Sequence, residues 1–171
     1  MVLIQHLVET VALWLRGTTL SWAVAGGYPW IWPVCEILHF LGLCLLFGVI
    51  GCLDLRMLGV GKGLPIQPLQ RMVPFAIAGF CLNLVTGALF FVGAPFQYIH
   101  NYPFWLKMSF IVLAGVNVGA FEWGGLSQVV DRIEAGGEAP LRAKVVATTS
   151  LFLWIGVMFW GRMLPFLGNA F

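Results

Sequence analysis

Four long apolar runs divide the chain, and polar residues gather between them. Crossing a hydrocarbon core of about 30 Å takes roughly 20 apolar residues in a helix, and each run comes close to or exceeds that length. The stretches between the first and second runs and between the third and fourth are rich in Gly, Pro and charge, which favours turns outside the membrane. The pattern predicts an all-α integral membrane four-helix bundle, a single membrane domain over residues 1–171 with both termini on one side. The predicted spans are approximately residues 31–53, 72–93, 103–121 and 145–163.

Residues 1–17 have a different pattern, too short and too polar to span. Apolar side chains recur at helical spacing on one face, and polar ones lie toward another; the apolar set is Leu3, Leu7, Val11 and Trp14, and the polar set is His6, Glu9 and Arg16. This pattern predicts an N-terminal interfacial amphipathic helix. Gly26, Gly27 and Pro29 then interrupt the chain before the first span. The aromatic residues around this break, Trp22, Tyr28, Trp30 and Trp32, are typical of a membrane-interface belt.

Composition supports a lipid-embedded chain. Hydrophobic residues make up 60% of the 171 residues and charged residues only 9%, with a mean hydropathy of +0.93. A soluble globule of this size could not solvate such a surface. The net charge of +2 is too small to indicate nucleic-acid binding, and no GxSxG, HExxH, P-loop or GxGxxG motif is present. At most, the chain is expected to be an electron-transfer or oxidoreductase subunit.

Basic residues predict the orientation. Arg56, Lys62, Arg71, Arg132, Arg142 and Lys144 lie in or beside the two longer loops, and Arg16, Lys107 and Arg162 lie toward the other side, which is six against three of the nine Lys and Arg. Loops enriched in Lys and Arg stay in the cytoplasm. The chain is therefore predicted to be a multi-pass protein of the bacterial inner (plasma) membrane, with both termini and the 94–102 linker on the periplasmic side.

Few ionisable residues lie within or next to the spans, and each is a functional candidate because a charge in a membrane is costly. Glu36 and His39 are three residues apart and share a face of the first span. Antiparallel alternation of the helices places the other candidates in the same, outer leaflet: His100, Lys107 and Arg162.

Three readings of this cluster are open. In the structural one, Glu36 pairs with Lys107 or Arg162, and His39 fixes helix packing through a hydrogen bond. In the second, His39 ligates a b-type haem whose propionates lie near Lys107 or Arg162. His100 or His6 is then the second axial ligand, or the haem is five-coordinate. The third is a copper site with His39 and His100 as metal ligands, joined by Cys35 and Met108.

Other polar and small residues predict helix contacts. Asn83, Thr86 and Asn117 are expected to form hydrogen bonds between helices. Glycines in the first two spans, Gly42, Gly48, Gly79 and Gly87, would permit close helix approach. The Asp54-Leu55-Arg56 turn is expected to cap the first span, with Arg56 available to a lipid phosphate.

Four segments carry a resemblance to a known family. They are Glu36-Ile37-Leu38-His39-Phe40-Leu41-Gly42, Asp54-Leu55-Arg56-Met57-Leu58-Gly59, His100-Asn101-Tyr102-Pro103-Phe104 with Leu106-Lys107, and Leu153-Trp154-Ile155-Gly156 with Gly161-Arg162. Over residues 30–165 the chain resembles an uncharacterised bacterial family of small four-helix inner-membrane proteins. That family is distantly similar to copper-resistance D-type membrane domains and to the haem-containing protoporphyrinogen oxidase of bacterial haem synthesis.

The resemblance implies the fold first and a haem site second. In the oxidase, a His on an early helix and a Trp-Leu-x-x-Lys start of a later helix resemble His39 and Trp105-Leu106-Lys107. Many members of the uncharacterised family place a His where this chain has Glu122, which argues against a second site at the inner end of the third span.

These observations lead to three functional hypotheses. The first is a b-type haem-binding membrane protein that transfers electrons, with a quinol or a periplasmic redox protein as its partner. The second is a non-catalytic accessory transmembrane subunit of a larger membrane complex. The third is copper transport.

Overall fold

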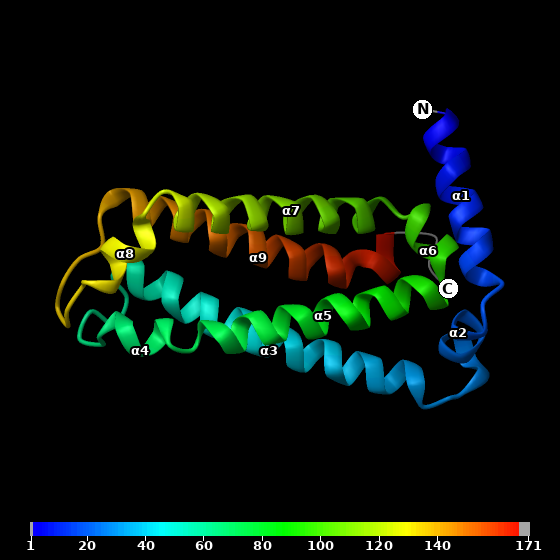
Figure 1. Ribbon diagram of the computed structural model, residues 1–171, viewed down its shortest axis with the longest axis horizontal. Helices are drawn as coiled ribbons and strands as arrows, with labels where there is room; N and C mark the ends of the chain where they lie inside the picture. Colours follow the sequence, from blue (N-terminus) through cyan, green and yellow to red (C-terminus); the bar gives the residue numbers. More distant parts are fainter. Residues whose placement is uncertain (1, 168–171) are drawn as a thin grey trace.

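The computed structural model describes residues 2–167, which are almost entirely helical and contain no strand (Figure 1). Four long helices run side by side, and each is long and apolar enough to cross a membrane. The predicted all-α four-helix bundle is confirmed. The helices are α3 (Ile31–Met57), α5 (Val73–Gly93), α7 (Tyr102–Trp123) and α9 (Leu141–Leu167).

Short helices occupy the segments that the sequence left as polar linkers. At one end of the bundle lie α4 (Ile66–Gln70) and α8 (Leu126–Asp131), and at the other lies α6 (Pro95–Ile99). The long helices also extend beyond the predicted spans, because α3 continues to Met57 and α9 begins at Leu141. Hydropathy detects only the part of a helix that lies in hydrocarbon, so polar helical turns at the ends escape it.

The N-terminal segment folds as α1 (Val2–Arg16), followed by α2 (Thr19–Trp22) and the π-helical turn η1 (Ala23–Gly27). Figure 1 shows α1 crossing the end of the bundle at a steep angle to the four long helices. Its apolar side chains stay exposed: Leu7 is 60% and Trp14 is 70% accessible. A helix that lies across a bundle end with bare apolar side chains fits the predicted interfacial helix. Met1 and the side chain of Leu3 lie outside the described part.

The bundle consists of two tightly packed hairpins, α3 with α5 and α7 with α9. In the first hairpin the backbones touch at two glycines. A Cβ atom on Gly42 would lie 2.8 Å from the carbonyl oxygen of Gly79, and one on Gly79 would lie 2.6 Å from that of Gly42. The predicted close approach is thus confirmed at this pair, whereas a Cβ on Gly48 would meet nothing within 4 Å. Asn117 Nδ2 donates to the Val146 carbonyl at 3.1 Å and so joins α7 to α9 as predicted.

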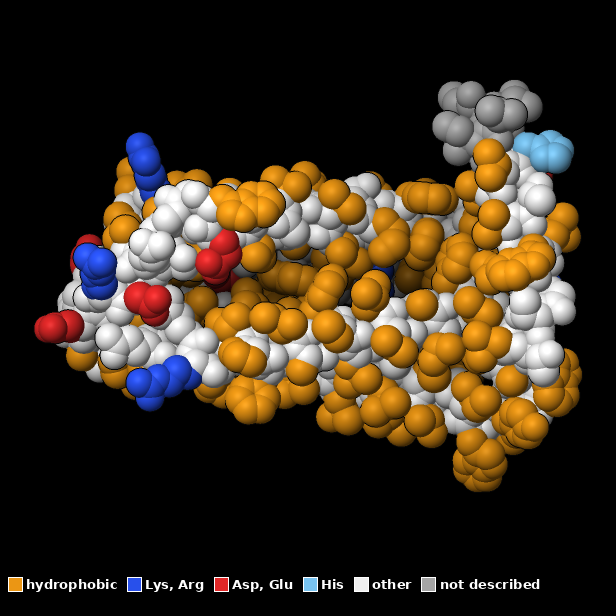
Figure 2. Space-filling model, viewed as in Figure 1, with side chains coloured by type: hydrophobic (Ala, Val, Ile, Leu, Met, Phe, Trp, Pro, Cys, Tyr) orange, Lys and Arg blue, Asp and Glu red, His pale blue; other side chains and the backbone are white. Residues whose placement is uncertain are grey.

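The two hairpins meet along α3 and α9, while α5 and α7 make little contact with each other. A core of apolar side chains fills the middle of the bundle; its buried members are Leu46, Val49, Ala76, Ala114, Leu153, Trp154 and Val157. Figure 2 shows a furrow along one face of the bundle, lined by hydrophobic side chains, with blue atoms of a basic side chain at its floor. We call this open side between α5 and α7 the lateral furrow.

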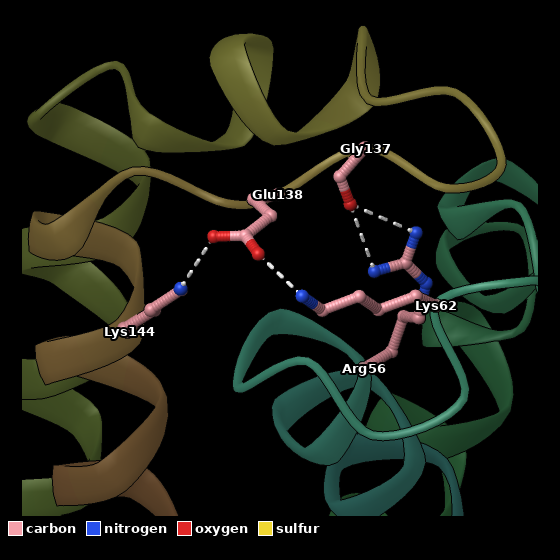
Figure 3. A network of polar contacts seen from close by, with 5 residues as sticks. All are labelled: Arg56, Lys62, Gly137, Glu138 and Lys144. Atoms are coloured by element: carbon pink, nitrogen blue, oxygen red, sulfur yellow. Dashed lines mark hydrogen bonds and ion pairs between the residues drawn. The ribbon is translucent and has the colours of Figure 1, made fainter.

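Charged side chains gather at the end of the bundle that carries α4 and α8, which we call the α8 end (Figure 2). There Glu138 forms ion pairs with Lys62 and with Lys144, the latter at 3.2 Å, and ties the loop after α3 to the start of α9 (Figure 3). Hydrogen bonds from these two ammonium groups lower the pKa of the Glu138 carboxyl. The opposite end, which carries α1 and the end of α9, we call the α1 end.

Arg56 lies beside this network, and its expected role at a lipid phosphate is wrong. Its side chain is only 2% exposed and points into the loops (Figure 3). Nε donates to the Leu64 carbonyl at 2.6 Å, and the other guanidinium nitrogens donate to the carbonyls of Gly137 at 3.3–3.4 Å and Glu134 at 3.5 Å. Arg56 therefore joins both loops of the α8 end through backbone acceptors, which hydropathy cannot anticipate.

Candidate functional site

His39 lies in the half of α3 nearer the α1 end, and α5 holds its ring in one orientation. The Nδ1 atom of His39 lies 2.7 Å from the hydroxyl oxygen of Thr86. That hydroxyl donates its own hydrogen to the carbonyl of Leu82 at 2.8 Å, one turn back along α5. With the single hydroxyl hydrogen of Thr86 on Leu82, the hydroxyl oxygen accepts from His39, and this arrangement assigns the ring proton to Nδ1.

This hydrogen bond fixes which nitrogen of His39 can bind a ligand. In a neutral imidazole protonated at Nδ1, the lone pair belongs to Nε2. Nε2 makes no hydrogen bond among the side chains that the structure describes. A histidine whose second nitrogen donates to an oxygen is the usual arrangement of a metal-ligating imidazole.

Small and aromatic residues of α5 surround the ring. The Phe90 ring meets it edge to face, with 5.6 Å between ring centroids. A Cβ atom on Gly87 would lie 3.8 Å from the Cε1 atom of His39. The ring is only half-buried. Gly87 therefore places only backbone against this edge of the imidazole.

Lys107 of α7 provides the positive charge of the site. Its Nζ atom lies against α9, where a Cβ on Gly161 would be 3.4 Å away. Lys107 lies near the start of α7, in the half of the bundle nearer the α1 end, where His39 lies on α3. No described side chain forms an ion pair with it. A cation inside a membrane protein normally faces an anion or a water-filled space, so this one is suited to an anionic ligand.

Glu36 shares the face of His39 but does not reach Lys107 or Arg162 in an ion pair. Its carboxylate is exposed and accepts a hydrogen bond from the indole nitrogen of Trp32 at 3.2 Å. Burial and the negative charge of Glu36 raise the pKa of Tyr98, on α6, to about 12. Glu36 therefore lies about one turn from His39 toward the α1 end, and its charge acts on a phenol that stays protonated at neutral pH.

The other predicted residues lie apart from His39. His100 is exposed, donates from Nδ1 to the Phe96 carbonyl at 3.2 Å, and faces Glu9 of α1, whose carboxylate lies 3.9 Å from Nε2. Arg162 is exposed as well, with its guanidinium 5.4 Å from the ring centre of Phe166. His6 is exposed on α1, near Thr10. The structure thus places His39 and Lys107 in the same half of the bundle, and leaves His100, Arg162 and His6 at the surface.

The residues predicted as copper ligands do not come together either. Cys35 is buried one turn before His39 on α3. Within the described chain, no three His, Cys, Asp or Glu side chains gather as metal ligands would. A copper site stays a prediction.

Sequence reasoning did not assign two residues of this site. Thr86 was expected to join helices, but its register with His39 was not recognised, although both lie at a similar depth in adjacent antiparallel spans. The Lys107 side chain packs against Gly161 of α9, and the spacing of glycines in the sequence does not predict this contact.

Comparison with protein-family models, with curated proteins and with solved structures gives no match for this chain. The resemblance to the uncharacterised bacterial family therefore stays a prediction, and the function rests on the site itself.

Proposed function

We propose that this chain is a b-type haem-binding membrane protein that transfers electrons, with His39 as an axial ligand through Nε2. The observation that carries the proposal is the hydrogen bond from His39 to Thr86, because it leaves Nε2 unprotonated and orients the ring. When bound, haem supplies one-electron chemistry. The chain would supply the ligand, its orientation and an apolar surrounding.

The charge of Lys107 supports the same ligand. Haem carries two propionates, and an ammonium without an acidic partner in the chain can neutralise one of them. Gly87 puts no side chain beside the imidazole, and the hydrophobic lateral furrow opens between α5 and α7. His100 and His6 are exposed and contact Phe96, Glu9 and Thr10 instead of His39, so we propose ligation by one histidine.

The electron donor we propose is a quinol, and the acceptor is a redox protein at the α1 end. We propose the hydrophobic lateral furrow as the route of a lipid-soluble donor. The site lies closer to the α1 end than to the α8 end. By the distribution of Lys and Arg, we infer that the α1 end is periplasmic and that the membrane is the bacterial inner membrane.

An optical spectrum tests the proposal. The chain is expressed with 5-aminolaevulinate to supply haem, purified in detergent, and measured oxidised and dithionite-reduced. We expect a Soret band and a reduced α band, both lost in His39→Ala and retained in His100→Ala. A colourless wild-type protein would contradict the proposal, as would equal pigment in both variants.

An accessory subunit of a larger membrane complex is the second candidate function. It is favoured by α7, where only 6% of the span is buried within the chain, against 39% for α9. A partner helix could cover that face. Co-purification of a stoichiometric partner with a colourless chain would support this function over the first.

A further inference from the structure

We propose that the α1 end binds the phosphate group of a phospholipid headgroup, at a hollow built around Arg16. This site is separate from His39 and does not depend on haem. The hollow has a volume of about 600 Å³ and is lined by Arg16, Ser21, Trp22, Ala25, Gly26 and Gly27.

Arg16 has unused hydrogen-bonding capacity. Arg16 is the last residue of α1. Its Nη1 donates at 2.9 Å to the carbonyl of Gly93, which is the last residue of α5. That bond holds the guanidinium between the two helices. Its remaining N–H groups have no partner among the described residues, and no acidic side chain pairs with it. A planar guanidinium binds two phosphate oxygens at once.

Ser21 provides a second polar group in the wall of the hollow. Its side chain is only 1% exposed, and its hydroxyl oxygen has no hydrogen-bond partner in the chain. A buried hydroxyl without a partner is costly, and a bound acceptor would remove that cost. Gly26, at φ +131°, has no side chain to fill the space.

The position of the hollow points to a lipid as the source of the phosphate. Trp22, which lines the hollow, is 58% exposed, and Trp30, three residues after Gly27, is 76% exposed, as expected for indoles at headgroup depth. On its other side, Arg16 borders a smaller hollow of about 140 Å³, formed by Ala94, Pro95, Phe96 and Gln97. This largely apolar hollow suits the glycerol ester part of a lipid whose phosphate lies on Arg16.

Two ligands with identical tails test the proposal. Detergent-purified protein is titrated with dioctanoyl phosphatidylglycerol or with dioctanoylglycerol, which lacks the phosphate, and native mass spectrometry counts the bound molecules. We expect one phospholipid per chain and no comparable diacylglycerol binding. Arg16→Gln, which removes the guanidinium and its charge, is expected to weaken phospholipid binding about tenfold, as loss of a charge-assisted hydrogen-bond pair would.

The matched control is Arg162→Gln, which removes an exposed arginine near the same end and leaves binding unchanged. Equal loss in both arginine variants, equal binding of dioctanoylglycerol, or displacement of the lipid by equimolar inorganic phosphate would each overturn the proposal. If Arg16→Gln does not purify, Ser21→Ala decides. This variant removes an oxygen that makes no bond within the chain, and we expect about threefold weaker binding from it; unchanged binding would overturn the proposal.

Discussion

Replacing Arg56 by Met should destabilise the bundle more than any surface arginine replacement. The variant keeps an unbranched side chain but removes every hydrogen bond to the two loops of the α8 end. The Leu64 carbonyl loses a short charge-assisted bond, which contributes about 1.5–3 kcal/mol. The contacts to Gly137 and Glu134 are 3.3–3.5 Å long and add less. Together we expect a loss of about 3 kcal/mol in the free energy of unfolding.

Thermal unfolding in detergent, followed by circular dichroism, measures this loss. For a chain of this size, 1 kcal/mol corresponds to about 2–4 °C in Tm, so Arg56→Met should unfold about 6–12 °C lower. Arg132→Met is the control, because Arg132 is exposed in the same region, and it should change stability by less than about 0.5 kcal/mol. Arg56→Lys should be nearly as unstable as Arg56→Met, since one ammonium cannot reach three carbonyls. Equal Tm values for Arg56→Met and Arg132→Met would refute the reasoning.

Three further predictions follow from the packing, the loops and the site. Gly79→Ala places a Cβ against the backbone of α3 and should cost about 1–3 kcal/mol, whereas Gly48→Ala should be neutral or slightly stabilising; both are measured by thermal unfolding. Because the pKa of Glu138 is lowered, the stability that its ion pairs contribute is present above the ordinary carboxyl range and is lost as the pH falls below about 4. In Glu138→Gln, the Tm should therefore depend less on pH in this acid range. A pH dependence of the Tm equal to that of the wild type would contradict the prediction. Thr86→Val removes the hydrogen-bond acceptor for His39 and should weaken haem affinity at least about tenfold in a haem titration. Thr148→Val is the control, because the Thr148 hydroxyl donates to the Lys144 carbonyl within α9, and it should leave haem affinity unchanged.

The four spans were predictable because lipid requires long apolar helices, and a hydrocarbon core leaves few alternatives. The contact of Gly42 with Gly79 and the bond from Asn117 to α9 also followed from residue type and depth. Hydropathy could not predict α4, α6 or α8, since their polar turns lie outside hydrocarbon. It also misplaced Arg56, because the carbonyls that bury this side chain come from two loops distant in sequence.

The site was predictable in part. Counting spans correctly placed His39 and Lys107 in one half of the bundle, but leaflet assignment alone does not give side-chain direction. His100 follows α6, whose path turns it toward Glu9 on α1, and Arg162 lies on the exposed face of α9. Both outcomes depend on helix rotation and linker conformation, which a single sequence does not encode locally.

Haem content of the purified chain tests the central claim most directly. A pyridine haemochrome assay on protein of known concentration gives the number of b-type haems per chain. We expect about one haem in wild type, as for a single ligating histidine, and almost none in His39→Ala at unchanged helicity. Wild-type protein without haem, or His39→Ala with the wild-type amount, would contradict that claim.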